Sequence, residues 1–78
     1  MDVKEDFLKE FGKFLRDMRE KKGLSQRELE YRGEATRDLI SKIENGNSNP
    51  TIYTIKKICD AMEIDMGEFF KEFTKSKN

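Results

Sequence analysis

Residues 24–51, LSQRELEYRGEATRDLISKIENGNSNPT, carry the signals that decide the fold. Ser25 is followed three residues later by Glu28, which is the spacing of a capping box at the start of a helix. Gly33 interrupts that helix soon afterwards, and Thr36 can cap a second helix after a short turn. The stretch therefore predicts two short helices, at about residues 25–32 and 36–45, joined by a tight turn.

The residues on either side of this pair follow the same helical pattern. Before it, apolar residues recur at three- and four-residue spacing from Phe7 to Met18, and Gly23 follows where a helix end is expected. They predict one long first helix over about residues 3–21. After the pair, Thr51 and Asp65 stand at cap positions, each ahead of further apolar residues. The fourth helix is expected to bury one stripe made of Ile52, Ile55, Ile58, Cys59 and Met62.

The composition limits what this all-α chain can do. Its 78 residues suffice for one small core, so we expect a single domain over residues 1–78, built from five helices. Sixteen Lys and Arg balance sixteen Asp and Glu, and histidine is absent. Cys59 is the lone cysteine, which excludes an internal disulfide and a Cys/His zinc site. No carboxylate accompanies a nucleophile or a phosphate-binding loop, so we expect neither enzyme activity nor a cofactor.

Charge and hydropathy also indicate where the chain works. No stretch has the apolar length that spans a bilayer, and the first residues lack signal-peptide features, so we expect a cytoplasmic protein with no membrane partner. Residues 13–32 carry seven basic and four acidic side chains, whereas residues 60–72 carry one basic and five acidic ones. The chain is therefore polarised, with one basic part and one acidic part, although its formal net charge is zero.

Two short helices with a tight turn between them, the second followed by a polar loop, have the shape of a helix-turn-helix. The segments REKKGLSQREL (19–29), ISKIENG (40–46) and NPT (49–51) fall in the order and spacing of the Cro and phage-repressor (XRE) family, which this sequence resembles over about residues 11–70. The resemblance implies a lambda-repressor-like DNA-binding domain of five helices, here with an extended first helix. It also implies double-stranded DNA as the partner and transcription regulation as the function.

The resemblance makes the helix that begins at Thr36 the recognition helix. Helical spacing agrees, since residues 38 and 42 share one side, as do residues 37 and 41. Arg37 is the best candidate for a bidentate guanine contact, and two roles are open for Asp38: accepting a bond from a cytosine amino group or repelling phosphate. An ordinary solvated face is the alternative for the whole set of predicted base contacts: Arg37, Asp38, Leu39, Ser41 and Lys42.

A second set of residues is expected along the DNA backbone. Gln26 stands where the family has a glutamine that touches phosphate. The loop after the recognition helix offers side-chain amides, hydroxyls and free backbone N–H groups, which bind phosphate without adding charge. A plain turn is the alternative for this loop, because the same residue types are common in turns. The full set of predicted backbone contacts is Gln26, Arg27, Thr36, Asn45, Asn47, Ser48 and Asn49.

Two further residues have a structural role in the resemblance. Arg19 and Glu44 correspond to a family pair whose salt bridge ties the first helix to the recognition helix. We therefore assign Glu44 to the scaffold and exclude it from base reading. Removing either partner should weaken DNA binding indirectly, through the position of the recognition helix.

The turn between the two motif helices departs from the family pattern. Glu30 stands where the family prefers alanine, and Glu34 where a glycine usually makes the turn. We expect Gly33 to adopt the unusual backbone angle and Glu30 to lean outward, toward Arg27 or Lys42.

The chain has more phenylalanine than so small a core needs. Phe7, Phe14, Phe70 and Phe73 are candidates for a self-association surface; the alternative is that the long first helix packs on the last helix within one chain. In the first case the protein is a homodimer on a near-palindromic operator. The expected function is a sequence-specific transcriptional regulator, and the alternative is an antitoxin- or coactivator-like module that uses the fold to bind a protein partner.

Overall fold

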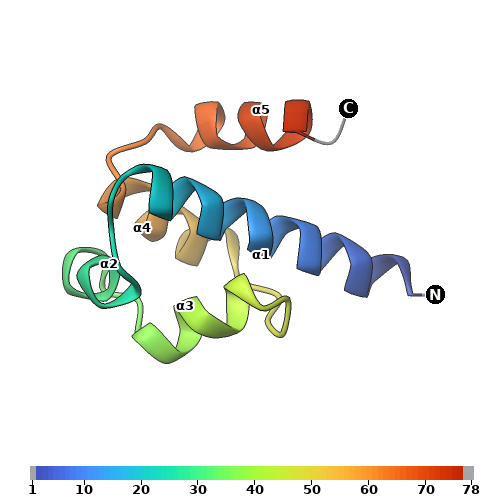
Figure 1. Cartoon of the computed structure of the whole chain (residues 1–78), viewed down its shortest axis with the longest axis horizontal. Coiled ribbons are helices and arrows are strands. Elements are labelled where there is room, and N and C mark those ends of the chain that lie inside the picture. The colour runs from blue at the N-terminus through green and yellow to red at the C-terminus, as the bar shows by residue number, and fades with distance from the viewer. Residues whose placement is uncertain (1, 77–78) are drawn as a thin grey trace.

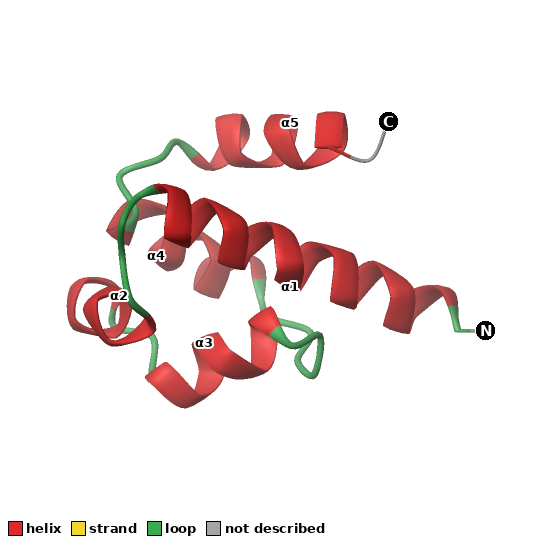
Figure 2. Cartoon of the chain, in the orientation of Figure 1, coloured by secondary structure: helices red, strands yellow, loops and turns green. Residues whose placement is uncertain are grey.

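The computed structural model describes residues 2–76, which form a bundle of five α-helices and no strand (Figure 2). The helices are α1 (Val3–Lys21), α2 (Gln26–Gly33), α3 (Arg37–Glu44), α4 (Ile52–Ala61) and α5 (Met66–Ser76). The all-α prediction, with a long first helix and two short motif helices, is confirmed.

The helices begin at the polar residues that the sequence marks as caps. Ser25 Oγ accepts a hydrogen bond from Glu28 N at 3.0 Å, and Glu28 Oε1 accepts one from Ser25 N at 3.0 Å, which completes the capping box. Thr36, Thr51 and Asp65 cap α3, α4 and α5 in the same way, each accepting from the N–H three residues later. These local bonds set where each helix starts.

Figure 1 shows how the helices pack around the long α1. α5 returns alongside α1 in the opposite direction, α3 lies on the other side of α1, and the first turns of α1 extend past the remaining helices. The core between them is one cluster whose fully buried members include Leu15, Leu29, Ile40, Ile58 and Phe69. α3 is thus supported on its inner side and lies at an edge of the bundle.

The stripe predicted for α4 is wrong at one position. Ile55, Ile58, Cys59 and Met62 are buried, but the side chain of Ile52 is 65% exposed. Ile52 is the first residue of α4, one turn before Ile55, and it borders an open groove instead of the closed core. An apolar residue at the end of a periodic stripe is covered only if a neighbouring element extends that far.

The turn between α2 and α3 also differs from the prediction. Glu34, and not Gly33, adopts the left-handed conformation, with φ of 60°. Gly33 is the buried last residue of α2, where an added Cβ would lie 2.9 Å from the Cβ of Ala61 in α4. Because this close approach of α2 and α4 requires the glycine, the exposed Glu34 takes the left-handed angle at a cost of about 1 kcal/mol.

Candidate nucleic-acid interface

α3 has one buried side and one side that faces solvent. Ile40 and Ile43 are 0% and 1% exposed and lie in the core. The opposite side is exposed or half-buried and carries all five residues predicted to read bases: Arg37, Asp38, Leu39, Ser41 and Lys42. Leu39 is half-buried against the core, so it offers only part of its side chain to a thymine methyl group. The helical period thus separates the residues that hold α3 from those that can contact DNA.

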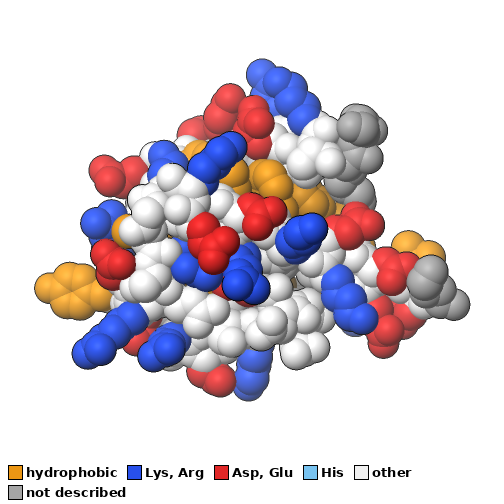
Figure 3. Space-filling view, in the orientation of Figure 1, with side chains coloured by type: hydrophobic (Ala, Val, Ile, Leu, Met, Phe, Trp, Pro, Cys, Tyr) orange, Lys and Arg blue, Asp and Glu red, His pale blue; other side chains and the backbone are white. Residues whose placement is uncertain are grey.

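The charges on this outer side of α3 are not equivalent. Lys42 Nζ lies 3.1 Å from Asp38 Oδ2, one helical turn away, and both side chains remain largely exposed. The Arg37 guanidinium makes no ion pair with any residue in the described range 2–76. Basic and acidic side chains are also interleaved over the face of the molecule in Figure 3. Arg37 is therefore the uncompensated cation of the outer side of α3, where a bidentate donor is expected.

Glu30 contacts the start of α3 in a way that the sequence did not indicate. Its Oε2 accepts a hydrogen bond from Arg37 N at 2.7 Å, so the prediction that Glu30 turns toward Arg27 or Lys42 is wrong. The physical reason is that the first N–H groups of a helix lack partners within it and attract acceptors. No spacing rule gives this contact, because it joins two helices across a turn.

The other end of α3 is fixed by a buried ionic network. Arg19 Nε and Nη2 donate to the two carboxylate oxygens of Glu44 at 2.7 and 3.0 Å, while Arg19 Nη1 donates to the carbonyl oxygen of Leu24 at 2.7 Å. Arg19 and Glu44 are each only 7% exposed. The hydrogen bond to Glu44 raises the pKa of Arg19, against the opposing effect of burial. The expected pair is present, and it ties α1 to the last residue of α3.

Gln26 belongs to the same network. Its Nε2 donates to Glu44 Oε1 at 2.9 Å, so the amide predicted to touch phosphate is held beside the end of α3. The next residue, Arg27, is exposed in the first turn of α2, and Thr36 uses its hydroxyl to accept from Leu39 N at 3.1 Å. These three predicted phosphate contacts lie at the starts of the two motif helices, where free N–H groups favour anions.

The loop after α3 begins with a tightly bonded helix end. Gly46, with φ of 75°, donates from its N–H to Ile43 O at 3.0 Å, and Asn47 N donates to Lys42 O at 2.8 Å, which is a Schellman motif. Asn45 N also bonds within the chain, to Ser41 O at 3.0 Å. The backbone N–H groups of residues 45–47 are therefore not free, contrary to expectation. The side chains of Asn45, Asn47, Ser48 and Asn49 stay candidates for phosphate, as do the backbone N–H groups of residues 48 and 49; the Ser48 side chain is half-buried.

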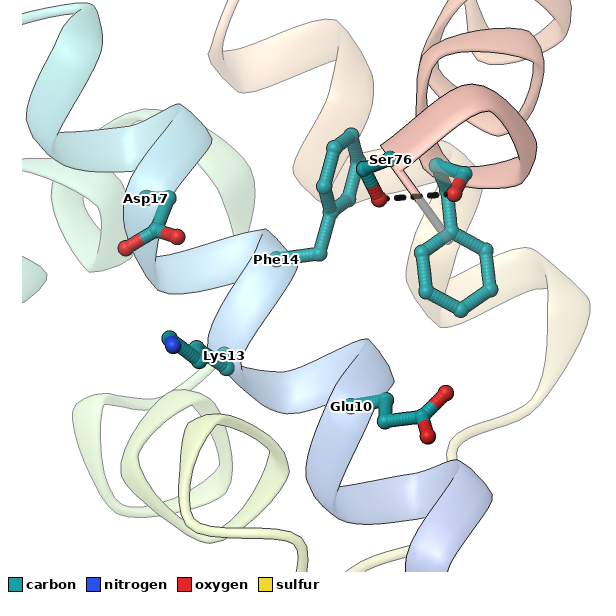
Figure 4. Close-up of a pocket in the computed structure, with 6 residues that line it drawn as sticks. Glu10, Lys13, Phe14, Asp17 and Ser76 are labelled. Carbon is teal, nitrogen blue, oxygen red and sulfur yellow. Dashed lines mark hydrogen bonds between the residues drawn. The ribbon is translucent and has the colours of Figure 1, made fainter. Parts of the chain in front are cut away.

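The four phenylalanines suggested for self-association pack mainly within the chain. Phe73 is 6% exposed, and its ring centroid lies 5.7 Å from that of Phe7 and 5.3 Å from that of Phe14. Phe70 stacks on Phe11 at 6.0 Å. Figure 4 shows Phe14 in the groove between α1 and α5, near Ser76, whose Oγ donates to the carbonyl oxygen of Phe73 at 2.8 Å. Phe7, which is 45% exposed, is the most exposed of the four.

The described residues provide no site for a metal ion. No group of three or more histidine, cysteine, aspartate or glutamate side chains comes together in residues 2–76 as ligands would. None of the helices in that range has the length and apolar character to cross a membrane.

Comparison with known proteins identifies this arrangement. A family model described as a helix-turn-helix domain matches residues 12–72. The transcriptional regulator PuuR of Escherichia coli (strain K12) is 36% identical over 61 residues, which cover 78% of this chain but 33% of PuuR, so the chain spans about a third of that relative's length.

Solved structures match over most of their length. The restriction-modification controller protein C.AhdI from Aeromonas hydrophila is 33% identical, with a TM-score of 0.78 over 82% of this chain and 97% of that chain. The controller protein C.Esp1396I, solved bound to a 19 base pair DNA duplex, is 28% identical, with a TM-score of 0.85 over 91% and 95% of the two chains. The chain therefore belongs to the helix-turn-helix domain family, of the Cro and phage-repressor type that its sequence resembles.

Proposed function

We propose that this protein is a sequence-specific, double-stranded-DNA-binding regulator of transcription that acts as a homodimer and catalyses no reaction. The observation that carries the proposal is the outer side of α3, where Arg37 is free of ion pairs while the inner side is held in the core. A helix that reads bases needs few donors and a fixed position, because a bidentate contact tolerates little misplacement. The C.Esp1396I complex with a 19 base pair duplex supports this use of the fold.

The charge balance bears on how such a protein selects its site. With a formal net charge of zero, general attraction to phosphate is weak, so affinity must come from directional contacts to bases and to the backbone. The neutral side chains of Gln26, Asn47 and Asn49 suit that purpose. A DNA reader must share a compartment with DNA, which agrees with the cytoplasmic location expected from the sequence.

A homodimer would place two recognition helices on half-sites about 34 Å apart. The C.Esp1396I tetramer, solved in complex with a 35 base-pair operator, supports assembly of such domains on DNA. In this chain Phe7 and Ile52, which are 45% and 65% exposed, border one groove that Leu8, Phe11 and Phe70 also line. We assign the dimer contact to this groove together with the exposed edges of Phe14 and Phe70, with Phe73 supporting them from the core.

Sedimentation of purified protein tests the dimer. We expect a dimer at high micromolar concentration, and a shift toward monomer in Phe7→Ser. Tyr31→Ser is the matched control, because Tyr31 is an aromatic residue that is 91% exposed on α2, away from the groove. A wild-type protein that stays monomeric at high micromolar concentration, with and without DNA, would remove the dimer from the proposal.

Selection of bound fragments from a random duplex pool, at low and at physiological salt, tests DNA reading itself. We expect an enriched inverted repeat, whose binding is lost in Arg37→Ala. Lys71→Ala is the control with the same charge change, since Lys71 lies exposed on α5, on the opposite side of α1 from α3 (Figure 1). No enrichment at either salt would refute the proposal and favour the protein-interaction module as the function of this fold.

A further inference from the structure

We infer that Glu30 is a positioning residue, which holds the start of the recognition helix so that Arg37 meets its base in a fixed orientation. The inference rests on the proposed function, but its physical basis is a contact within the free protein. Glu30 Oε2 accepts a hydrogen bond from Arg37 N at 2.7 Å. We call this contact the Glu30 latch.

The latch differs from an ordinary helix cap because it comes from another helix. Thr36, the residue that precedes α3, caps it locally by accepting from Leu39 N at 3.1 Å. Glu30 lies in the middle of α2, seven residues before Arg37, and is half-buried. Its carboxylate therefore joins α2 to the first N–H group of α3, where a negative charge also interacts favourably with the helix dipole.

The turn beneath the latch is short and contains one strained residue. Glu34 adopts a left-handed angle, with φ of 60°, which is unfavourable for a residue other than glycine. Between Gly33, packed on Ala61, and the capping residue Thr36, the turn consists of Glu34 and the buried Ala35. A charge-assisted hydrogen bond across this turn restricts the tilt and fraying of the first turn of α3.

The residue held by the latch is the one expected to read a base. Arg37 is the first residue of α3, so its Cα moves with any fraying of that turn. A bidentate contact to guanine needs both guanidinium donors in line with two acceptors, and a small tilt removes one of them. Loss of the latch should therefore reduce discrimination at the base pair that Arg37 reads more than it reduces general affinity for DNA.

Glu30→Ala tests the role of the latch. Alanine has the best helix propensity, so the substitution removes the carboxylate without weakening α2. Glu28→Ala is a matched control. It removes the same charge from the same helix and also a carboxylate bond to a backbone N–H, at 3.0 Å from Ser25 N, but this bond lies within the cap of α2 and not at the start of α3. Both variants are compared well below their melting temperatures, on the selected operator and on operators changed at one base pair.

Arg37→Ala should identify the base pair that Arg37 reads, because discrimination between the operator and a changed base is lost there. At that base pair we expect Glu30→Ala to lose about tenfold in discrimination, a loss of the order of one charge-assisted hydrogen bond. Glu28→Ala should keep this discrimination, and Glu30→Gln, which retains an oxygen acceptor, should lose less than Glu30→Ala. In an Arg37→Ala background, Glu30→Ala should have no further effect on discrimination. Equal losses in Glu30→Ala and Glu28→Ala, or effects that add in the double variant, would overturn the inference.

Amide hydrogen exchange tests the latch without DNA. The Arg37 N–H should be protected in the wild type and in Glu28→Ala, and exposed in Glu30→Ala or, if that variant does not fold, less protected in Glu30→Gln. Unchanged protection of Arg37 would overturn the inference even if the protein binds an operator. Conversely, a latch seen by exchange in a protein that selects no duplex would refute the proposed function and leave the contact intact.

Discussion

Replacing Arg19 with methionine should test whether the buried ionic network holds α3 in place. The substitution removes three hydrogen bonds, to Glu44 Oε2 at 2.7 Å, to Glu44 Oε1 at 3.0 Å and to the Leu24 carbonyl oxygen at 2.7 Å. It leaves the Glu44 carboxylate buried, with Gln26 as its remaining partner. Breaking a buried pair in this way costs about 3–5 kcal/mol. A domain of 78 residues has roughly 4–12 kcal/mol of stability in total, so Arg19→Met should be near the limit of folding.

Thermal and urea unfolding measure this loss directly. For a domain of this size, the expected change corresponds to a fall in melting temperature of roughly 12 °C or more. Arg16→Met is the matched control: Arg16 lies on the exposed side of α1 and pairs with Glu20 at 3.5 Å, with both side chains more than half exposed. That pair should contribute less than about 1 kcal/mol.

Removing both buried charges should be less harmful than removing one. Arg19→Met combined with Glu44→Met leaves no unpaired ion in the core, so the double variant should be more stable than either single variant. Because the pKa of Arg19 is raised above its usual value, the stability linked to the proton on the guanidinium is lost only as pH rises above that usual value. A loss of less than about 1 kcal/mol in Arg19→Met, or additive losses in the double variant, would refute this account of the network.

Four other substitutions test the backbone and the core. Gly12→Ala should destabilise the fold by about 3 kcal/mol in urea unfolding, because its Cβ would lie 2.7 Å from the backbone carbonyl oxygen of Glu44. Gly67→Ala in α5 should change stability by about 1 kcal/mol or less, because its Cβ would approach a side-chain oxygen of Asp65, at 3.0 Å, and not a backbone carbonyl of another helix. Glu34→Gly should stabilise by about 1 kcal/mol in the same assay, since glycine adopts a φ of 60° without strain. Burial raises the pKa of the Cys59 thiol to about 11 from 9.0, so the unfolded thiol ionises first and stability should fall between about pH 9 and 11. This pH dependence should be smaller in Cys59→Ala.

Helix boundaries were predictable because the signals that set them are local. The Ser25 and Glu28 side chains bond to each other's backbone within one turn, so their spacing in the sequence is also their spacing in the structure. The same holds for Thr36 and for the glycine after α3, where Gly46 takes the left-handed angle of a helix end. The outer side of α3 was assigned from the family resemblance, and the helical period agreed with that assignment.

The errors arose where distant elements meet. That Gly33 is needed against Ala61 depends on how closely α2 approaches α4, and this is a property of the packed structure. Exposure of Ile52 depends on where the core ends, and the bond from Arg37 N to Glu30 depends on the angle of the turn. By contrast, the Arg19 and Glu44 pair is equally distant but was expected, because the family resemblance supplied a contact that the residues alone did not indicate.

The placement of acidic residues connects the fold to the proposed way of reading DNA. Several surface cations of the described chain are paired with a carboxylate: Arg16 with Glu20, Lys56 with Asp60 and Lys42 with Asp38. General attraction to phosphate is thereby reduced, and specificity must depend on the position of a few donors.

Two further carboxylates supply that position. Glu44, the last residue of α3, is held by Arg19 of α1, and the N–H of Arg37, the first residue, is held by Glu30 of α2. α3, the proposed recognition helix, is therefore fixed at both ends by ionic groups that contribute nothing to bulk attraction. A carboxylate near DNA weakens the general affinity for DNA. A carboxylate at each end of α3 is understandable if the fixed Arg37 gains more in discrimination between sites than the protein loses in general affinity.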